Sequence, residues 1–238
     1  IRPDFLRFPV TTRGIPHKGW RDRAYEYAAS ALVEYLVEVE GFSFKELVEA
    51  VAGGTPLPGL ESWCQSQRGI SFARMYARFA AWALFAGDGC LAPFPLATFG
   101  SAPAASGEII EEQTTMDLTG AQLLRVSMTG THGLELDLYV LSEGERLPGN
   151  GVPLPMATLS TGESWDLSGL ASGDVLYGVV VNGKETGASV SLEYKAIGGA
   201  GTVLAEQTLP LGMAGPYTAG TAAVKIAADE QVIPLAVD

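Results

Sequence analysis

The sequence is that of an acidic protein, long enough for one large domain or two of ordinary size. It has 238 residues, of which 47% are hydrophobic and 18% are charged, and 15 Lys and Arg against 27 Asp and Glu give a net charge of −12. This charge argues against nucleic acid and anionic membrane surfaces as partners, because both select basic patches. No apolar run is long enough to form a membrane span.

The charged and aromatic residues are distributed unevenly along the chain. Residues 1–100 contain 10 basic and 10 acidic residues and 16 of the 21 aromatic residues. Residues 101–238 contain 5 basic and 17 acidic residues, so they carry the whole net charge. The segment 93–107 is rich in Pro, Gly, Ala and Ser, a composition typical of linkers. We therefore predict two domains, 1–92 and 108–238, joined by a linker over 93–107.

The first predicted domain shows the periodicity of helices. Apolar residues recur every three or four positions, with charged residues on the remaining face, until Gly41 ends the first helix. Ser43 and Glu46 form a capping box for the second helix, and Ser71 caps the fourth. The short connections predict a compact all-α bundle with an aromatic core. The expected helices cover residues 20–40, 44–52, 60–67 and 72–86.

The second predicted domain shows short strands rich in Val, Leu and Tyr, separated by turn residues. The segment 134–138 alternates strictly, which places three Leu on one face and the carboxylates of Glu135 and Asp137 on the other. This spacing predicts an antiparallel, jelly-roll-like β-sandwich, and so an α+β protein overall. The expected strands cover residues 122–129, 134–141, 175–181, 188–195, 202–209, 222–227 and 232–237.

The residues of common catalytic sites are sparse. The only histidines, His17 and His132, lie in different predicted domains, so the chain has no H-E-x-x-H zinc motif and no nucleophile beside a histidine base. We therefore assign no catalytic residue. Cys64 and Cys90 are either two buried thiols or a disulfide, and a disulfide would place the protein outside the cytoplasm.

Two weaker binding sites follow from the strand-rich half. Glu135 and Asp137 share a strand face, where they either bind Ca²⁺ or belong to a solvated outer face. Tyr139, Trp165 and Tyr177 are the aromatic residues available for stacking on a sugar, provided that they gather on one exposed face.

The helical half resembles a known arrangement. Residues 20–86 resemble the region downstream of the catalytic centre in gluzincin-type zinc metallopeptidases. The resemblance rests on residues 27–36, Gly41, Leu47, Val48 and Gly54, and later on Leu60, Trp63, residues 69–72, Trp82 and Leu84. In that family the resembling region is a supporting lobe, and zinc is bound by helices that precede it. The resemblance implies that any zinc belongs to an upstream segment, and that no cofactor is held by this chain.

The strand-rich half resembles bacterial pre-peptidase C-terminal domains. Residues 123–128, followed by 136–140, are similar to the paired strands of that family, and 175–181 are similar to a later strand. The family is a β-sandwich appended to secreted peptidases. The resemblance covers about residues 117–195 and assigns no role to residues 198–238.

Together the resemblances predict the non-catalytic C-terminal region of a secreted, metallopeptidase-like bacterial protein, located outside the cytoplasm. Its partners would be an upstream catalytic domain, which the start at Ile1 leaves room for, and a substrate or other protein. Such a lobe is expected to expose an apolar patch of several hundred Å² on its own, on the order of a typical interaction patch. The alternatives are a free-standing extracellular binding or adhesion module for polysaccharide or protein, and an enzyme of a different kind.

Overall fold

The computed structural model describes residues 32–52, 56–85, 112–142, 154–183, 186–213 and 217–228. Within these ranges helices come first and strands follow, which confirms the α+β class. The predicted linker over 93–107, the predicted strand over 232–237, His17 and Cys90 lie outside the described residues.

The helices occupy the predicted places. The helical residues 32–34 lead into the π-helix η2 (Tyr35–Val39), and α2 (Phe44–Val51), α3 (Pro56–Arg68) and α4 (Phe72–Phe85) follow. Residues 20–31 of the first predicted helix lie outside the described residues. Both predicted caps are present: the hydroxyl oxygen of Ser43 accepts from the amide of Glu46 at 3.4 Å, and that of Ser71 accepts from the amide of Arg74 at 3.1 Å. Helix α3 begins four residues earlier than predicted, at a proline, which the first turn of a helix tolerates.

The strands form two sheets. They are β1 (Glu112–Asp117), β2 (Leu123–Gly130), β3 (Glu135–Leu141), β4 (Ala157–Ser160), β5 (Ser164–Leu167), β6 (Val175–Asn182), β7 (Ala188–Ile197), β8 (Val203–Met213) and β9 (Thr218–Ala227). The sequence analysis does not predict the short strands β1, β4 and β5, because their sequences EQTTMD, ATLS and SWDL lack an alternating apolar pattern.

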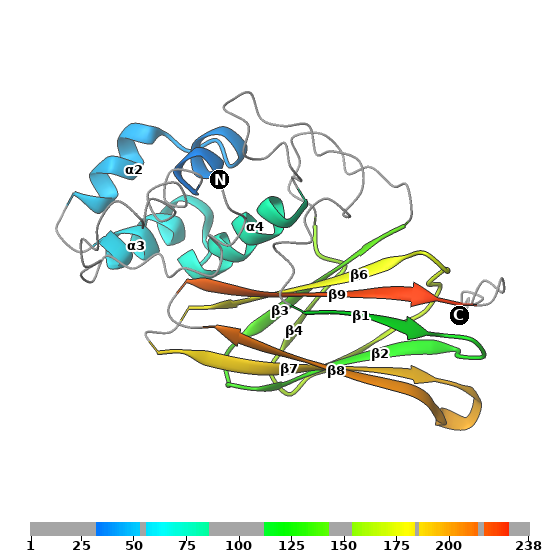
Figure 1. The fold of residues 1–238 in the computed structure, drawn as a ribbon. Coiled ribbons are helices and arrows are strands. Elements are labelled where there is room, and N and C mark those ends of the chain that lie inside the picture. Colours follow the sequence, from blue (N-terminus) through cyan, green and yellow to red (C-terminus); the bar gives the residue numbers. More distant parts are fainter. Residues whose placement is uncertain are drawn as a thin grey trace, which may run out of the picture.

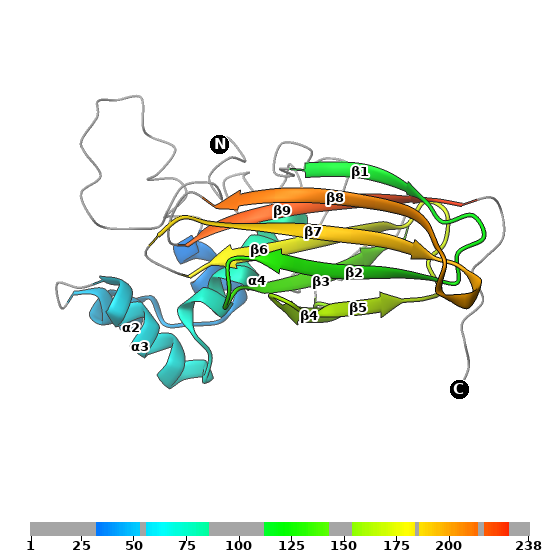
Figure 2. The same cartoon turned by 90° about the horizontal axis from the view of Figure 1, so that it is seen from below.

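The five-stranded sheet has the order β1-β9-β6-β3-β4, and the four-stranded sheet has the order β5-β2-β7-β8. Figure 2 shows β8, β7, β2 and β5 side by side in the second sheet. The expectation of purely antiparallel pairing is wrong at one edge, where β1 pairs with β9 in parallel. A parallel pair needs a long connection, and here all the intervening strands provide it.

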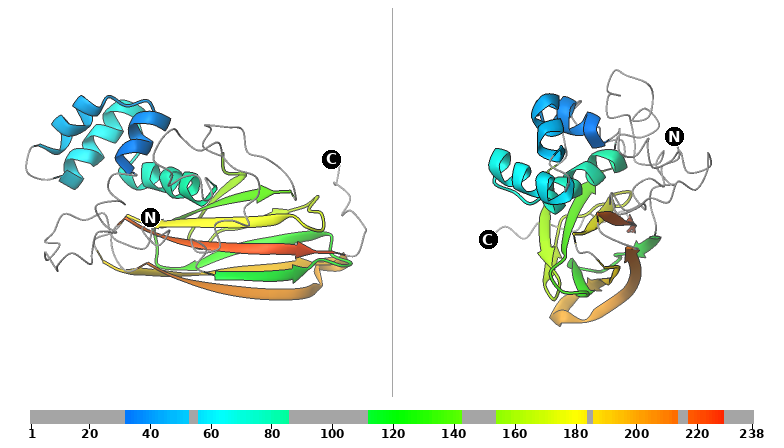
Figure 3. Two further views of the ribbon diagram at one scale, coloured as in Figure 1. Left: turned by 45° about the horizontal axis from the view of Figure 1, so that its top comes forward. Right: turned by 90° about the vertical axis from the view of Figure 1, so that its left-hand side faces the viewer.

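The apolar side chains form two clusters, one on each face of the five-stranded sheet. One cluster lies between the two sheets, with Leu136 and Val180 from the first and Leu192 from the second. The other contains the helices together with outward-facing residues of β3, β6 and β9, among them Tyr177 and Ala219. The molecule is therefore layered as helices, five-stranded sheet and four-stranded sheet (Figures 1 and 3). The two predicted domains are in contact, and α4 makes the principal contact, with β6.

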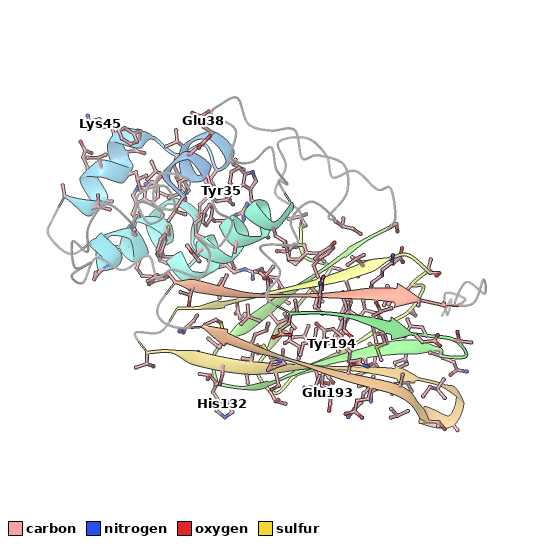
Figure 4. All side chains as sticks on the ribbon, viewed as in Figure 1. Tyr35, Glu38, Lys45, His132, Glu193 and Tyr194 are labelled. Carbon is pink, nitrogen blue, oxygen red and sulfur yellow. The ribbon has the colours of Figure 1, made fainter. Side chains whose placement is uncertain are left out.

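Tyr194 lies in the core between the sheets (Figure 4), and its hydroxyl has no hydrogen-bond partner among the described residues. The backbone of Gly178 lies next to this hydroxyl: a Cβ at Gly178 would be in ordinary van der Waals contact with its oxygen, at 3.7 Å. A buried polar group without a partner destabilises the folded state.

Replacing Tyr194 by Phe is therefore expected to raise the free energy of unfolding by about 1 kcal/mol. Tyr139 is the control, because it is also buried, at 3% exposed, but its hydroxyl bonds to Asp137, so Tyr139→Phe is expected to lower the free energy of unfolding by about 1 kcal/mol. Urea denaturation of both variants measures the two changes, and a loss of stability in Tyr194→Phe contradicts the assignment.

Candidate functional site

The outer face of β3 is the place where the structure departs most from the sequence prediction. Glu135, Asp137, Tyr139 and Leu141 alternate on this face, as expected, but only Glu135 is exposed. Asp137 is 1% exposed, because helix α4 covers this part of the sheet. The interpretation of the two carboxylates as a solvated face is therefore wrong for Asp137: an alternating strand has a solvated side only when no second layer packs on it.

Asp137 is paired with Arg74 of α4. One nitrogen of the guanidinium, Nη1, lies 2.6 Å and 2.7 Å from the two carboxylate oxygens. Thr158 of β4 completes the arrangement: its hydroxyl donates to Asp137 at 2.6 Å, and its oxygen accepts from the other nitrogen, Nη2, at 3.3 Å. The carboxylate of Glu135 lies 3.8 Å from Nη1 at the solvent side. We call these four residues, Arg74, Glu135, Asp137 and Thr158, the Arg74 cluster.

The charges in the Arg74 cluster stabilise one another. Burial alone would lower the pKa of Arg74, but the hydrogen bond to Asp137 and the charges of Asp137 and Glu135 raise it above its ordinary value. Burial also raises the pKa of Tyr139, and the neighbouring Asp137 carboxylate raises it further. Arg74 is thus a permanent cation and Tyr139 a neutral hydroxyl at neutral pH, which is the state that holds the ion pair together.

A second ion pair lies within the helical lobe. Arg78, one turn after Arg74, bonds with Nη2 to the nearly buried carboxylate of Glu40 at 3.1 Å, and the hydroxyl of Tyr35 donates to the same carboxylate. Burial and the contact with Glu40 raise the pKa of Tyr35. Figure 4 shows Tyr35 pointing from η2 toward α4. On consecutive turns of α4, Arg74 therefore binds the helix to the sheet and Arg78 binds it to the rest of the helical lobe.

Close apolar contacts surround the Arg74 cluster. The backbone at Gly183, after β6, approaches α4 so closely that a Cβ there would lie 2.8 Å from the Cβ of Ala73. The ring of Tyr217, just before β9, packs on Phe72 with 4.8 Å between ring centroids. Tyr217 has a φ of 52°, an unfavourable conformation for this residue type. These contacts seat the first turns of α4 on the sheet.

The Arg74 cluster does not have the form of a calcium site or an acid–base pair. The buried Asp137 carboxylate already faces a cation from its own chain, and its hydrogen-bonding partners hold it in place. No group of three or more His, Cys, Asp or Glu suited to a metal is found in the described part of the chain. What this arrangement does chemically is to bind a helix to a sheet.

The predicted sugar-stacking residues do not gather on an exposed face. Tyr139 and Tyr177 are each 3% exposed and lie beneath the helices, so the expectation that they present their rings to a ligand is wrong. Trp165 is half-buried, and the strand register pairs it with the buried Val126, so its side chain is directed to the core between the sheets. The sequence did not reveal that both faces of the first sheet are covered.

Cys64 of α3 is fully buried and has no disulfide partner among the described residues. Whether Cys64 and Cys90 are two thiols or a disulfide is not tested, because Cys90 lies outside the described residues. Burial raises the pKa of the Cys64 thiol to about 12, with smaller contributions from Glu61 and Glu40.

In a Cys90→Ser variant, we expect Cys64 of the native protein to react with a thiol reagent at pH 8 roughly a thousandfold more slowly than in guanidinium, since the thiolate is the reactive form. The rate of disulfide exchange with a coloured aryl disulfide measures this. Equal rates in native and unfolded protein would show that the thiol is accessible.

Arg74 and Thr158 are the residues that sequence reasoning missed. Arg74 lies on the side of α4 opposite Phe72 and Tyr76, with Arg78 one turn further on the same side, and this placement is typical of a solvated face. The sequence therefore carries no signal that Arg74 is paired with the sheet. Thr158 belongs to a four-residue strand that carries no such signal either.

The described helices include none long and apolar enough to cross a membrane. Comparison of the chain with models of known protein families, with curated proteins and with solved structures found no significant match.

Proposed function

We propose that this chain is the non-catalytic C-terminal region of a secreted metallopeptidase-like protein. In this proposal the helices form a supporting lobe for an upstream zinc-binding segment, and the two stacked sheets form a β-sandwich accessory domain that contacts the substrate or a partner protein. Both the location outside the cytoplasm and the zinc chemistry upstream belong to the proposal.

The observation that carries the proposal is the exposed apolar face of α2. Phe44 is 58% exposed and Val48 45% exposed, and they lie one turn apart on the helix that contacts mainly α3. Contact surfaces expose contiguous apolar side chains, and in our proposal these two belong to such a surface. Figure 1 shows α4 next to the sheet and α2 farther away from it. In our proposal, an upstream segment packs on the exposed apolar side chains of α2.

The experiment is a zinc-dependent peptidase assay on a peptide library, with this chain alone and with the full encoded polypeptide. We expect activity only when the upstream segment is present. Zinc-dependent cleavage by residues 1–238 alone would overturn the proposal, and inactivity of the full polypeptide would favour the free-standing binding module instead.

A double variant, Phe44→Ser with Val48→Ser, tests the surface itself. Because both side chains are exposed, we expect the free energy of unfolding of this chain to change by less than about 0.5 kcal/mol, while the activity of the full polypeptide falls. Lys45→Ala is the matched control, since Lys45 is exposed on the same helix and, among the described residues, forms an ion pair only with Glu49, at 3.8 Å. Equal activities of the double variant and the control would count against a contact at this face.

A further inference from the structure

The outer face of the five-stranded sheet is an interaction surface whose partner is helix α4. The face is apolar where the helix lies: Tyr177, Val179 and Val181 of β6 and Ala219 and Ala223 of β9 all belong to the cluster shared with the helices. The small residues of β9 lie opposite the larger ones of β6, with Ala219 beside Val181 and Ala223 beside Tyr177. The small side chains of β9 allow α4 to pack close to the sheet beside the larger side chains of β6. We call this part of the sheet face, together with Asp137 of β3, the seat of α4.

The seat is specific for α4, because one buried charge in it has its partner on that helix. Asp137 is 1% exposed, and the guanidinium of Arg74 bonds to both of its oxygens. A buried carboxylate without its cation is strongly destabilised, so the sheet face disfavours any helix that lacks an arginine at this position.

The close approach at Gly183 adds a steric requirement. The Cβ of Ala73 would be only 2.8 Å from a Cβ at residue 183, so a small residue on each side is needed for α4 to reach the sheet. The ion pair and this contact are on adjacent residues of the first turn of α4, with Phe72 beside them against Tyr217.

From these contacts we propose that the helical lobe and the sheets remain bound as a non-covalent complex when the chain between them is cut. The predicted linker over 93–107 would then tether the two parts without being needed to hold them together. Proteolysis of this connection would convert the protein into a stable two-chain form, and would not release the sheets as a separate module. This inference does not depend on the proposed function.

The experiment uses the whole chain with a specific protease site inserted within residues 101–107. After complete cleavage, we expect the two fragments to co-elute in size-exclusion chromatography at micromolar concentration. Separate elution of the fragments, or precipitation of either one, would overturn the proposal, whatever the outcome of the peptidase assay.

Variants separate specific recognition from general apolar adhesion. Arg74→Met is expected to weaken the association of the cut fragments roughly 100-fold, because it leaves the buried Asp137 carboxylate without its cation. Adding Asp137→Asn is expected to restore most of the lost affinity. Arg125→Met is the matched control: Arg125 pairs with Asp166 at 2.7 Å, but in solvent and within one fragment. Equal weakening by Arg74→Met and Arg125→Met would contradict recognition through the ion pair.

A steric pair of variants probes the same seat without changing charge. Gly183→Ala is expected to weaken the association at least tenfold, because the added methyl group meets Ala73. Gly212→Ala serves as the control, since a Cβ at Gly212 meets nothing within 4 Å. Unchanged association in Gly183→Ala would show that α4 is not seated as the structure places it.

Discussion

Replacing Arg74 by Met is expected to lower the free energy of unfolding by about 3 kcal/mol. The physical reason is the environment of Asp137, which is 1% exposed and loses the cation that bonds to both of its oxygens. The methionine side chain keeps much of the apolar contact of the arginine stem, so the variant isolates the loss of charge. Urea denaturation followed by circular dichroism measures the change.

Arg125→Met is the control for this prediction. Arg125 and Asp166 form an ion pair with two hydrogen bonds of 2.7 Å, but the side chains are 44% and 41% exposed. An exposed pair contributes little because water competes for both charges, so the expected loss of stability is much smaller than that of Arg74→Met. If the two variants lose equal stability, the burial of Asp137 has no energetic consequence and our account of the helix–sheet junction is wrong.

The second large effect is expected from residues 108–238 expressed without the helices. Removal of the helices uncovers the outer face of the five-stranded sheet, with Tyr139, Tyr177, Val179 and Val181. Burial of one such side chain contributes about 1.5–3 kcal/mol, so the truncated protein loses several kcal/mol and exposes a continuous apolar face. It is expected to bind the dye ANS strongly and to self-associate.

The measurements are dye fluorescence and sedimentation velocity, with the full chain as the control. Adding Asp137→Asn to the truncated protein removes the charge that has lost its Arg74 partner but not the apolar face, so it is expected to leave dye binding unchanged. A monomeric 108–238 fragment that binds no dye would mean that the sheets fold as an autonomous module, as the linker alone suggested.

The elements were predicted well wherever their own sequence carries a periodic pattern. The capped helices α2 and α4 and the apolar strands β2, β3, β6 and β7 begin within two residues of their predicted starts. The short polar strands β1, β4 and β5 have no such pattern and take their structure from the strands beside them.

The candidate site could not be predicted in the same way, because it depends on contacts between distant segments. Arg74 and Asp137 are 63 residues apart, and a period-two pattern reports the two faces of a strand but not what covers them. The alternation of β3 therefore predicts the correct face for Asp137, but it does not predict that helix α4 covers this face and buries the carboxylate. The same missing layer explains why Tyr139 and Tyr177 were interpreted as ligand-binding residues.

The most direct test of the account is a double-mutant cycle on Arg74 and Asp137. The free energies of unfolding of Arg74→Met, Asp137→Asn and the double variant give the coupling between helix α4 and strand β3. Our account predicts that the double variant is more stable than the sum of the single changes implies, by about 1–3 kcal/mol. Additivity within about 0.3 kcal/mol would contradict it, because two residues in a buried ion pair cannot act independently.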